Sequence, residues 1–438
     1  MQRTLISEVK NNIGAKVKIF GFVQTIRDQG SIKFLMIRDV TGLIQVVVTK
    51  SNPEVLATAK TLPHESVVEI TGLAKEEKQA PGGFEIEAEN IAILSLSDPE
   101  IPMPVIEKGS QEEADQSIRL DWRWIDLRKP QNTLVFKVWT VMESAFREYW
   151  TSNNYIEIHS PKLISTASES GAEVFEVKYF KNKAYLAQSP QFYKQMAMAA
   201  GFEKVFEVGP VFRAEPSFTS RHATEFTGYD AEISYIQSHY DVMEEEEKAI
   251  QFALQKVKEK YGDEIKNVFN KEVIVPTLPF PKISMKEAKK ILSDLGVKSE
   301  KEGDLSPEEE RAISDYVKDK HNHQFVFITE YPVTVRPFYH MRDEKDNSLT
   351  KSFDLLQEGL EITTGAQREH RYDVLVSQAK EKGMKLKSLQ FYLNFFKYGC
   401  PPHGGFGMGP NRIIMKLLGI DNVRDASFVY RGVKRLEP

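Results

Sequence analysis

The first hundred residues alternate hydrophobic and polar positions with a period of two, which is typical of half-buried strands. Turn signals such as the glycine-rich stretch 81–83 separate these runs from one another. Strands are therefore expected at residues 17–26, 33–38, 43–49, 67–73 and 84–94. Five strands in so short a segment predict a small closed barrel with its own apolar interior.

The hydrophobic period changes to 3.6 further along the chain. With Asn132 or Thr133 as its cap, a helix is expected from Thr133, because the apolar positions up to Tyr149 fall on one face. A strand is expected at 155–159. Further helices are expected at residues 190–200, 240–261, 286–295 and 307–320. The segments that join the intervening strands are too short for helical crossovers, so the strands should be antiparallel and the fold α+β.

A proline-rich, polar stretch at 97–111 marks a boundary between these two patterns. We expect a barrel domain at 1–105, a linker at 106–131 and a second domain at 132–438. Inside the second domain, the Lys/Glu-rich helices of about 264–322 are expected to form a solvated insertion.

The overall charge excludes a uniformly basic nucleic-acid binder. The 438 residues hold 58 Lys and Arg against 63 Asp and Glu, a net charge of −5. Charge is uneven, however: residues 1–50 hold 8 basic and 3 acidic residues (net +5), and residues 51–105 hold 3 and 10 (net −7). One side of the barrel therefore suits a polyanion, although a solvated charge pattern would look the same.

A single cysteine, Cys400, excludes an intrachain disulfide and a cysteine-based metal cluster. No apolar run approaches the roughly 20 residues of a membrane helix. The N-terminus lacks the apolar segment of a secretory signal. We therefore expect no membrane association and a cytoplasmic location, where thiols stay reduced.

Residues 205–235 read as a strand, a polar loop and a second strand. On the second strand, Phe226, Asp230 and Glu232 share one face, which makes poor core but a good floor for a cationic or metal-bound ligand. Polar side chains that suit phosphate lie at the end of the first strand and in the loop: Arg213, Glu215, Arg221 and His222. A surface hairpin with ion pairs explains the same pattern equally well.

Three further segments carry candidate chemistry. In 361–371, a carboxylate lies beside hydroxyls, as Mg²⁺ requires, although a polar helix start is an equal alternative. In 401–412, four glycines predict a turn with positive φ angles and close backbone approach, without the lysine of a P-loop. In 188–195, Gln191 and Lys194 share one helix face, although a lysine there is usually a surface residue.

In this order, the segments resemble the three motifs of class II aminoacyl-tRNA synthetases. The helix and strand that end at Pro161 resemble motif 1, the dimerisation element; the residues FRAE at 212–215 with their loop and next strand resemble motif 2; and residues 404–412 resemble motif 3. The closest resemblance is to class IIb, the aspartyl-tRNA synthetases of the archaeal/eukaryotic type. It is carried by GSIKFLMIRDVTGLIQVVV, QSPQFYKQ, GAQREHR and PPHGGFGMGPNR.

This resemblance implies an OB-fold barrel that binds the anticodon, followed by an antiparallel sheet flanked by helices. It also implies a homodimer that uses ATP with Mg²⁺ to convert L-aspartate into aspartyl-adenylate, and then charges tRNA(Asp). Whether tRNA(Asn) is also charged stays open, because Pro81 matches relaxed members of the family while Gln24 stands where they tend to have His.

Residue roles follow from the same resemblance. Arg213 matches the arginine on the α-phosphate, Arg412 that near the γ-phosphate, and Phe226 the ring on adenine. The other matches at the ATP site are Glu215, Arg221, His222 and Gly409. Glu361 and Thr364 match Mg²⁺ ligands, which Asp354 could join; the family usually has Ser at the position of Thr364.

The aspartate side chain is matched by Lys194 and Arg368, because a desolvated carboxylate needs cationic partners. Residues around the substrate are matched by Glu169, Gln191, Asp230 and Thr364. In the barrel, Phe34 matches the ring that stacks on an anticodon base, with Phe34 as a core residue the alternative. Base-contacting positions are matched by Arg27, Gln45 and Glu85.

Three other functions were weighed against this one. Lys194 argues against an asparaginyl-tRNA synthetase, whose neutral substrate side chain leaves no need for an ammonium group. An asparagine synthetase-like paralogue would lack the barrel, and a non-enzymatic relative would lack Arg213 and Arg412. The C-terminal FVYRGVKRLEP departs from the family's more usual ending, which is rich in Phe, Pro and Arg, so the resemblance assigns no role to Arg431.

Overall fold

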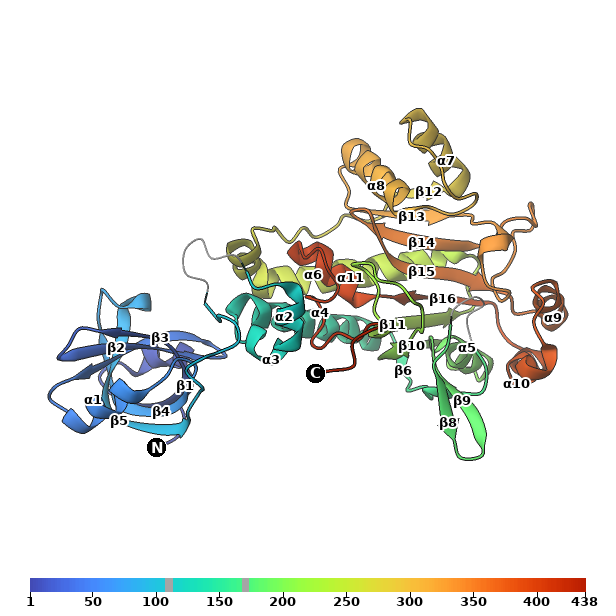
Figure 1. Ribbon diagram of the computed structural model, residues 1–438. Helices are drawn as coiled ribbons and strands as arrows, with labels where there is room; N and C mark the ends of the chain where they lie inside the picture. The colour runs from blue at the N-terminus through green and yellow to red at the C-terminus, as the bar shows by residue number, and fades with distance from the viewer. Residues whose placement is uncertain (107–112, 168–172) are drawn as a thin grey trace. The chain divides into compact units, whose positions relative to one another are not determined.

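The computed structural model describes residues 1–106, 113–167 and 173–438 (Figure 1). Contacts divide the chain into two units, Met1–Thr133 and Leu134–Pro438. Within the described ranges, no helix is long and apolar enough to span a bilayer.

The first unit is built on a closed barrel, as the alternating pattern predicts. Its strands are β1 (Lys16–Asp28), β2 (Ile32–Asp39), β3 (Gly42–Thr49), β4 (Val67–Glu76) and β5 (Phe84–Ser95). They close in the order β1-β2-β3-β5-β4, and only β3 and β5 run parallel. The five predicted strands are confirmed, and each extends beyond its predicted bounds or matches them.

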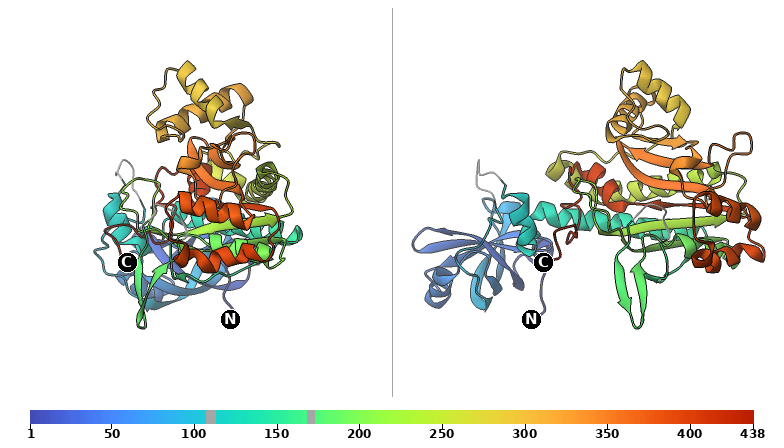
Figure 2. Two further views of the ribbon diagram at one scale, coloured as in Figure 1. Left: turned by 90° about the vertical axis from the view of Figure 1, so that its right-hand side faces the viewer. Right: turned by 45° about the vertical axis from the view of Figure 1, so that its right-hand side comes forward.

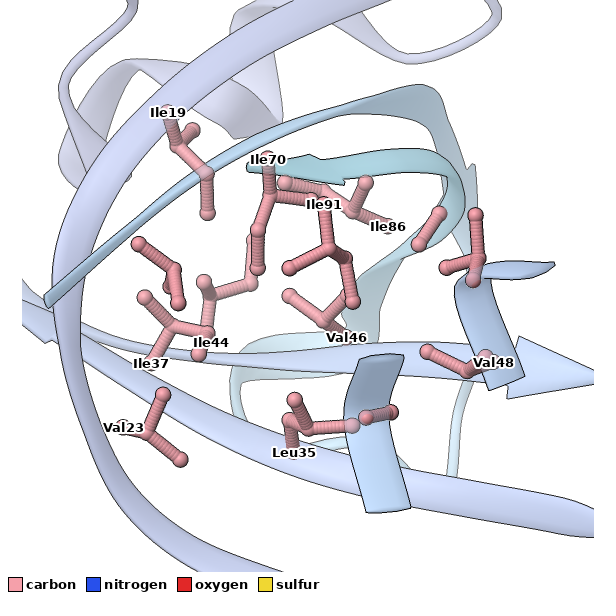
Figure 3. Close-up of a cluster of buried hydrophobic side chains, with 14 of the residues drawn as sticks. Ile19, Val23, Leu35, Ile37, Ile44, Val46, Val48, Ile70, Ile86 and Ile91 are labelled. Atoms are coloured by element: carbon pink, nitrogen blue, oxygen red, sulfur yellow. The ribbon is translucent and has the colours of Figure 1, made fainter. Parts of the chain in front are cut away.

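The inward positions of these strands form an apolar core (Figure 3). Leu35 and Ile37 of β2 are fully buried, whereas Phe34, the neighbour of Leu35, points to the opposite side of the strand and is not part of the core. A helix, α1 (Pro53–Thr61), lies between β3 and β4 and was not predicted. Its nine residues are too few for a clear 3.6 period, although Asn52 accepts a capping hydrogen bond from the backbone N–H of Val55. Short helices also form between 113 and 129: α2 (Gln116–Asp121) and α3 (Arg123–Asp126).

The second unit is built on an eight-stranded sheet in the order β12-β13-β14-β15-β16-β11-β10-β6, counted over the described residues (Figures 1 and 2). The strands are β6 (Ile156–Glu157), β10 (Lys204–Phe212), β11 (Glu225–Ser234), β12 (Lys282–Ser284), β13 (Phe325–Thr329), β14 (Ser352–Gln357), β15 (Leu360–Arg368) and β16 (His403–Met408). The inner strands are antiparallel, as expected, while the edge strands β12 and β6 pair in parallel. A smaller sheet, β7 (Leu163–Ile164), β9 (Asn182–Leu186) and β8 (Glu176–Tyr179), projects from this unit as a hairpin (Figure 2).

Two long helices cover one face of the large sheet. They are α4 (Pro130–Ser152) and α6 (His239–Phe269). Tyr229 of β11 points to this face and lies edge-on to Phe146 of α4, with ring centroids 5.5 Å apart. Helix α4 begins at Pro130 rather than at the predicted Thr133, because a proline without an N–H is tolerated in the first turn.

The remaining helices flank the sheet at other positions. They are α5 (Gln191–Ala199), α7 (Met285–Asp294), α8 (Pro307–His321), α9 (Tyr372–Glu381), α10 (Leu386–Lys397) and α11 (Pro410–Leu418). The expectation of a merely solvated insertion needs correction. Helices α7 and α8 share a buried core with β12 and β13, which includes Leu292, Ile313 and Val326. Apolar residues on their inner sides pack in this core, while most of their Lys and Glu residues are exposed; Glu309 and Glu310 of α8 are buried.

Candidate active site

A cavity of about 290 Å³ opens on the face of the sheet opposite α6. It gathers side chains from all four segments that the sequence singled out. The predicted residues that line it are Gln191, Lys194, Arg213, Glu215, Arg221, His222, Phe226, Asp230, Glu361, Thr364, Arg368, Gly409 and Arg412. Glu169 lies outside the described residues. Asp354, the possible further metal ligand, is not among the lining residues, and the other predicted residues of this unit that the structure describes are brought together in one place.

Strand β11 provides the floor of this cavity through its alternation. Phe226, Gly228 and Asp230 line the cavity, while Tyr229 between them points to the helical face and is fully buried. Glu232, the next residue on the cavity side, lies beneath the floor and is completely buried. Tyr235 follows the end of β11 and is exposed at a positive φ of 60°, so it does not continue the alternation of this strand.

Two buried cations converge on Glu232. The ammonium of Lys194 lies 3.3 Å from Oε2 of Glu232 and 2.9 Å from Oδ1 of Asp230. The guanidinium of Arg368 donates from Nε to Oε1 of Glu232 at 2.9 Å. Burial alone would raise the pKa of Glu232, but Arg368 and Lys194 outweigh it and hold that pKa below its usual range. Two cations and two carboxylates thus balance in a space where an unpaired charge would be costly.

The glycine-rich segment 401–412 is a strand and not the predicted turn. Gly404, Gly405 and Gly407 lie in β16 without positive φ angles, and only the predicted close approach is found. A Cβ at Gly405 would lie 2.2 Å from Oε2 of Glu232, so a side chain there would displace the buried carboxylate. The backbone carbonyl of Gly405 accepts from Arg368 at 2.9 Å, and that of Phe406 accepts from Lys194 at 2.9 Å.

Just before β16, Cys400 is partly buried, with its Sγ 3.7 Å from Nδ1 of His403. Burial raises the pKa of the Cys400 thiol to about 12.

A cluster of arginines lies at the end of the cavity away from Lys194 and Arg368. The guanidinium of Arg213 sits 5.6 Å from the centre of the Phe226 ring. Arg412 lies in the first turn of α11, as predicted, and donates from Nη1 to the carbonyl of Glu361 at 2.6 Å. Burial lowers the pKa of Arg412, and Arg221 and Arg213 lower it further, since like charges oppose one another. This end of the cavity is therefore positively charged and suited to bind a polyanion.

Arg221 is held by a residue that the sequence did not indicate. Its Nη1 donates to Oε2 of Glu310, on α8, at 2.8 Å. Burial raises the pKa of Glu310 to about 7, although Arg221 opposes that shift. The helices of 264–322 thus reach the cavity through Glu310.

The residues predicted to hold Mg²⁺ fit that ion. The hydroxyl of Thr364 donates to Oε1 of Glu361 at 3.4 Å, and Thr364 pairs in register with Asp354 on β14. Oδ2 of Asp354 accepts from Arg336 at 2.7 Å, whereas its buried Oδ1 has no hydrogen-bond partner within residues 1–106, 113–167 and 173–438. The described residues contain no group of three or more His, Cys, Asp or Glu suited to a metal. Few protein oxygens beside an arginine-rich phosphate site suit Mg²⁺, which shares its coordination sphere with substrate phosphates.

Two more lining residues were missed. His340 accepts from Nη1 of Arg368 through Nε2 at 3.1 Å, and its Nδ1 has no partner in the described part of the chain. Burial and the neighbouring Arg368 hold the pKa of His340 well below its usual range, so this ring is neutral. Arg336 is the second lining residue that no motif indicates. Both come from the segment between β13 and β14, where neither a motif nor a period marks them.

The barrel residues that match anticodon contacts form two pairs. The guanidinium of Arg27 lies 4.6 Å from the centre of the Phe34 ring. Gln45 donates from Nε2 to Oε2 of Glu85 at 2.8 Å. Because Phe34 stands outside the barrel core, its alternative role as a core residue is not supported.

Comparisons with known proteins agree with this architecture. A family model described as class II tRNA synthetases (D, K and N) matches residues 115–429, and one described as an OB-fold nucleic acid binding domain matches residues 17–94. The aspartate–tRNA(Asp/Asn) ligase of Aeropyrum pernix is 43% identical, covering 99% of this chain and 98% of its own. The aspartate–tRNA(Asp) ligase of Pyrococcus abyssi is 41% identical over the same shares.

Solved structures give the same result. The asparaginyl-tRNA synthetase of Pyrococcus horikoshii, complexed with asparaginyl-adenylate, superposes with a TM-score of 0.91 at 34% identity, with 100% of both chains covered. A structure titled a putative aspartyl-tRNA synthetase from Leishmania major superposes with a TM-score of 0.91 at 28% identity, covering 100% of this chain and 95% of its own. The chain belongs to the class II tRNA synthetases of the D, K and N group, with an N-terminal OB-fold domain.

Proposed function

We propose that this enzyme is an aspartate–tRNA ligase that attaches L-aspartate to tRNA(Asp) through aspartyl-adenylate. The relatives named as aspartate–tRNA ligases match over nearly the whole chain. The observation that carries the choice of amino acid is the pair of buried cations, Lys194 and Arg368, beside an arginine-rich cavity. Cations at this depth suit a substrate carboxylate, which would be costly to bury unpaired.

The first step joins aspartate to the α-phosphate of ATP. An oxygen of the substrate's α-carboxylate bonds to the α-phosphorus, the bond from that phosphorus to the β-phosphate oxygen breaks, and pyrophosphate leaves with the electron pair. In our proposal Arg213 holds the α-phosphate, Arg412, Arg221 and His222 hold the distal phosphates, and Phe226 stacks on adenine. These cations stabilise the charge that develops during displacement, and no general base is needed because the attacking carboxylate is already ionised.

Aspartate would lie between the two charged ends of the cavity. Asp230 and Gln191 would bind its ammonium, and Lys194 and Arg368 its side-chain carboxylate. Lys194 already bonds Asp230, so the substrate ammonium competes for that carboxylate and frees Lys194 for the substrate side chain. Asparagine offers no charge to Lys194, and this favours aspartate over the amide of the related asparaginyl-tRNA synthetases.

Mg²⁺ would be held by Glu361 and Thr364, with Asp354 as a third oxygen donor. When bound, the ion supplies charge neutralisation to the phosphates. Burial raises the pKa of Asp354, and Arg336, which donates to its Oδ2 at 2.7 Å, opposes that shift.

In the second step the terminal ribose hydroxyl of tRNA attacks the aspartyl carbonyl, and AMP leaves. The barrel would read the anticodon, with Phe34 stacked on one base and Arg27, Gln45 and Glu85 at the base edges. Relatives of nearly equal similarity are named for tRNA(Asp) alone and for both tRNA(Asp) and tRNA(Asn). Aminoacylation of both purified tRNAs distinguishes these specificities.

We further propose a homodimer that acts in the cytoplasm. Support for the dimer comes from the edge strand β6, whose Ile156 is 48% exposed, next to the motif 1 helix α4. Light scattering on the purified protein measures the assembly directly.

The central experiment is ATP–pyrophosphate exchange with aspartate and with asparagine. Exchange that depends on aspartate and fails with asparagine is the expected result. Exchange with asparagine alone would reject the proposal and assign the chain to the asparaginyl enzymes.

A further inference from the structure

A second cavity, of about 400 Å³, lies next to the first. It is lined by the loop 219–221, by residues of α8 and α11, and by the turn between β14 and β15. That turn consists of Glu358 and Gly359, both at positive φ (45° and 78°), and Arg311 packs so closely on Gly359 that a Cβ there would clash. Arg221 lines both cavities, so the two sites share one cation.

Basic side chains outnumber acidic ones in the lining of the second cavity. Four basic residues line it, Arg221, Lys271, Arg311 and Lys416, against two acidic ones, Glu358 and Asp421, which leaves 4 − 2 = +2. Glu310, outside the lining, neutralises Arg221, and Gln324 donates to Glu358 at 2.8 Å. In the described part of the chain, Lys271, Arg311 and Lys416 form no ion pair within 4 Å.

Helix α11 links the cations of the two cavities. Arg412 and Lys416 are four residues apart, so they lie on the same side of the helix. Arg412 lines the first cavity and Lys416 the second. Burial lowers the pKa of Lys416, the carboxylates of Glu358 and Asp421 oppose that shift, and Lys271 and Arg311 add to it. The three cations and two carboxylates therefore share one electrostatic field. The basic side chains therefore continue from the phosphate end of the active site into the second cavity.

We propose that the second cavity binds inorganic pyrophosphate as it leaves the active site. The inference rests on the proposed function, because adenylate formation releases pyrophosphate beside Arg221 and Arg412. A small polyanion fits this location, because the cations converge on one hollow instead of spreading along a surface. Lys271 and Arg311 are exposed, so binding should be weak and should weaken further with salt, as release requires.

The test is calorimetric titration of inorganic pyrophosphate into the enzyme at low ionic strength, with the double variant Lys271→Gln/Lys416→Gln. We expect the variant to bind pyrophosphate about tenfold more weakly, equal to ~1.4 kcal/mol, with its ATP affinity unchanged within twofold. Pyrophosphate affinity equal to that of the wild type overturns the proposal. Lys318→Gln, an exposed lysine on α8, is the matched control and should change nothing.

Two further measurements separate the possible failures. Glu358→Gln removes a carboxylate from the cavity and should tighten pyrophosphate binding, so an unchanged or weaker affinity also contradicts the proposal. If the double variant does not fold, Lys271→Gln alone, at an exposed position, serves in its place. Loss of pyrophosphate binding in an enzyme without aspartate-dependent exchange would support the cavity and reject the proposed function. Normal exchange with unchanged pyrophosphate binding would reject the cavity alone.

Discussion

The barrel and the catalytic sheet differ in where they place the side chains that are proposed to bind substrate. In the barrel, Phe34 and Arg27 lie outside a continuous apolar core, so the side chains proposed to contact tRNA lie on the other face of the strands that form this core. In the catalytic sheet, Glu232, Lys194 and Arg368 are buried among the strands and hold one another in place. Under the proposed function, tRNA recognition by the barrel can be altered without loss of its fold, whereas in the catalytic sheet the same buried charges would serve both the fold and substrate binding.

The largest effect is expected from Lys194→Leu. The change removes the ammonium proposed to read the substrate carboxylate and leaves Asp230 and Glu232 with one cation fewer. Aspartate-dependent ATP–pyrophosphate exchange should fall below detection, while calorimetry should still show ATP binding. Substitution of the half-exposed Lys204 by Leu controls for general loss of a lysine. Retained exchange would refute the role of Lys194.

A buried carboxyl group of helix α6, Glu246, allows the cost of an unpaired charge in the catalytic unit to be measured. Glu246 of α6 is fully buried, neither of its oxygens has a hydrogen-bond partner among the residues that the structure describes, and burial raises its pKa from 4.5 to about 8. Between these values the folded state keeps a proton that the unfolded state has lost, so stability falls as the pH rises through this window. Glu246→Gln removes the titration and should gain up to about 4–5 kcal/mol at pH above 8, at ~1.4 kcal/mol per pH unit.

This gain is measured by denaturant unfolding at pH 5 and pH 8.5. Glu259→Gln, an exposed position on the same helix, should follow the wild type at both values. A constant difference between Glu246→Gln and the wild type at the two pH values would exclude the proposed titration.

Neighbouring residues on β2 test the separation of faces in the barrel. Leu35→Ala removes a fully buried side chain and should cost about 2–5 kcal/mol of stability. Phe34→Ala should leave stability nearly unchanged but remove a stacking interaction of ~1–3 kcal/mol, which raises the KM for tRNA at least severalfold. Adenylate formation should be normal in both proteins. A large loss of stability in Phe34→Ala would show that the two faces are not independent.

The smallest effect concerns Glu310. Its ionised carboxylate holds Arg221 and competes with a phosphate for that side chain. Glu310→Gln should therefore lower the KM for ATP by about two- to threefold at pH 8, the scale of ~0.5 kcal/mol. Because the pKa of Glu310 is about 7, the difference from the wild type should shrink at pH 6, where the carboxyl is mostly protonated. A KM that rises in the variant would contradict this competition.

The sequence predicts those features that depend on neighbouring residues, and it does not predict contacts between residues that lie far apart along the chain. Alternation places Asp230 and Glu232 on the cavity side of β11, because that pattern depends only on neighbouring residues. It does not predict that Glu232 meets Arg368, 136 positions away. The resemblance to a family, not the residue pattern, brought Lys194 and Arg368 into one site. His340 and Glu310 were missed because neither belongs to a motif or to a period.

The glycine-rich segment shows a different limit. Glycine and proline usually mark turns, so 401–412 was predicted as one. The glycines instead lie in a strand. Glycine is required at position 405, because Glu232 and the neighbouring backbone leave no room for a side chain there. The spatial requirement comes from β11, far away in the sequence, and local pattern cannot reveal it.

The single thiol has a practical consequence. Cys400 stays protonated near neutral pH, and a protonated thiol reacts slowly with maleimide dyes. A cysteine introduced on an exposed loop would thus be the fast-reacting group without removal of the native one. Fluorophores could then be attached at chosen positions of the otherwise unaltered enzyme, to follow tRNA arrival and departure in real time.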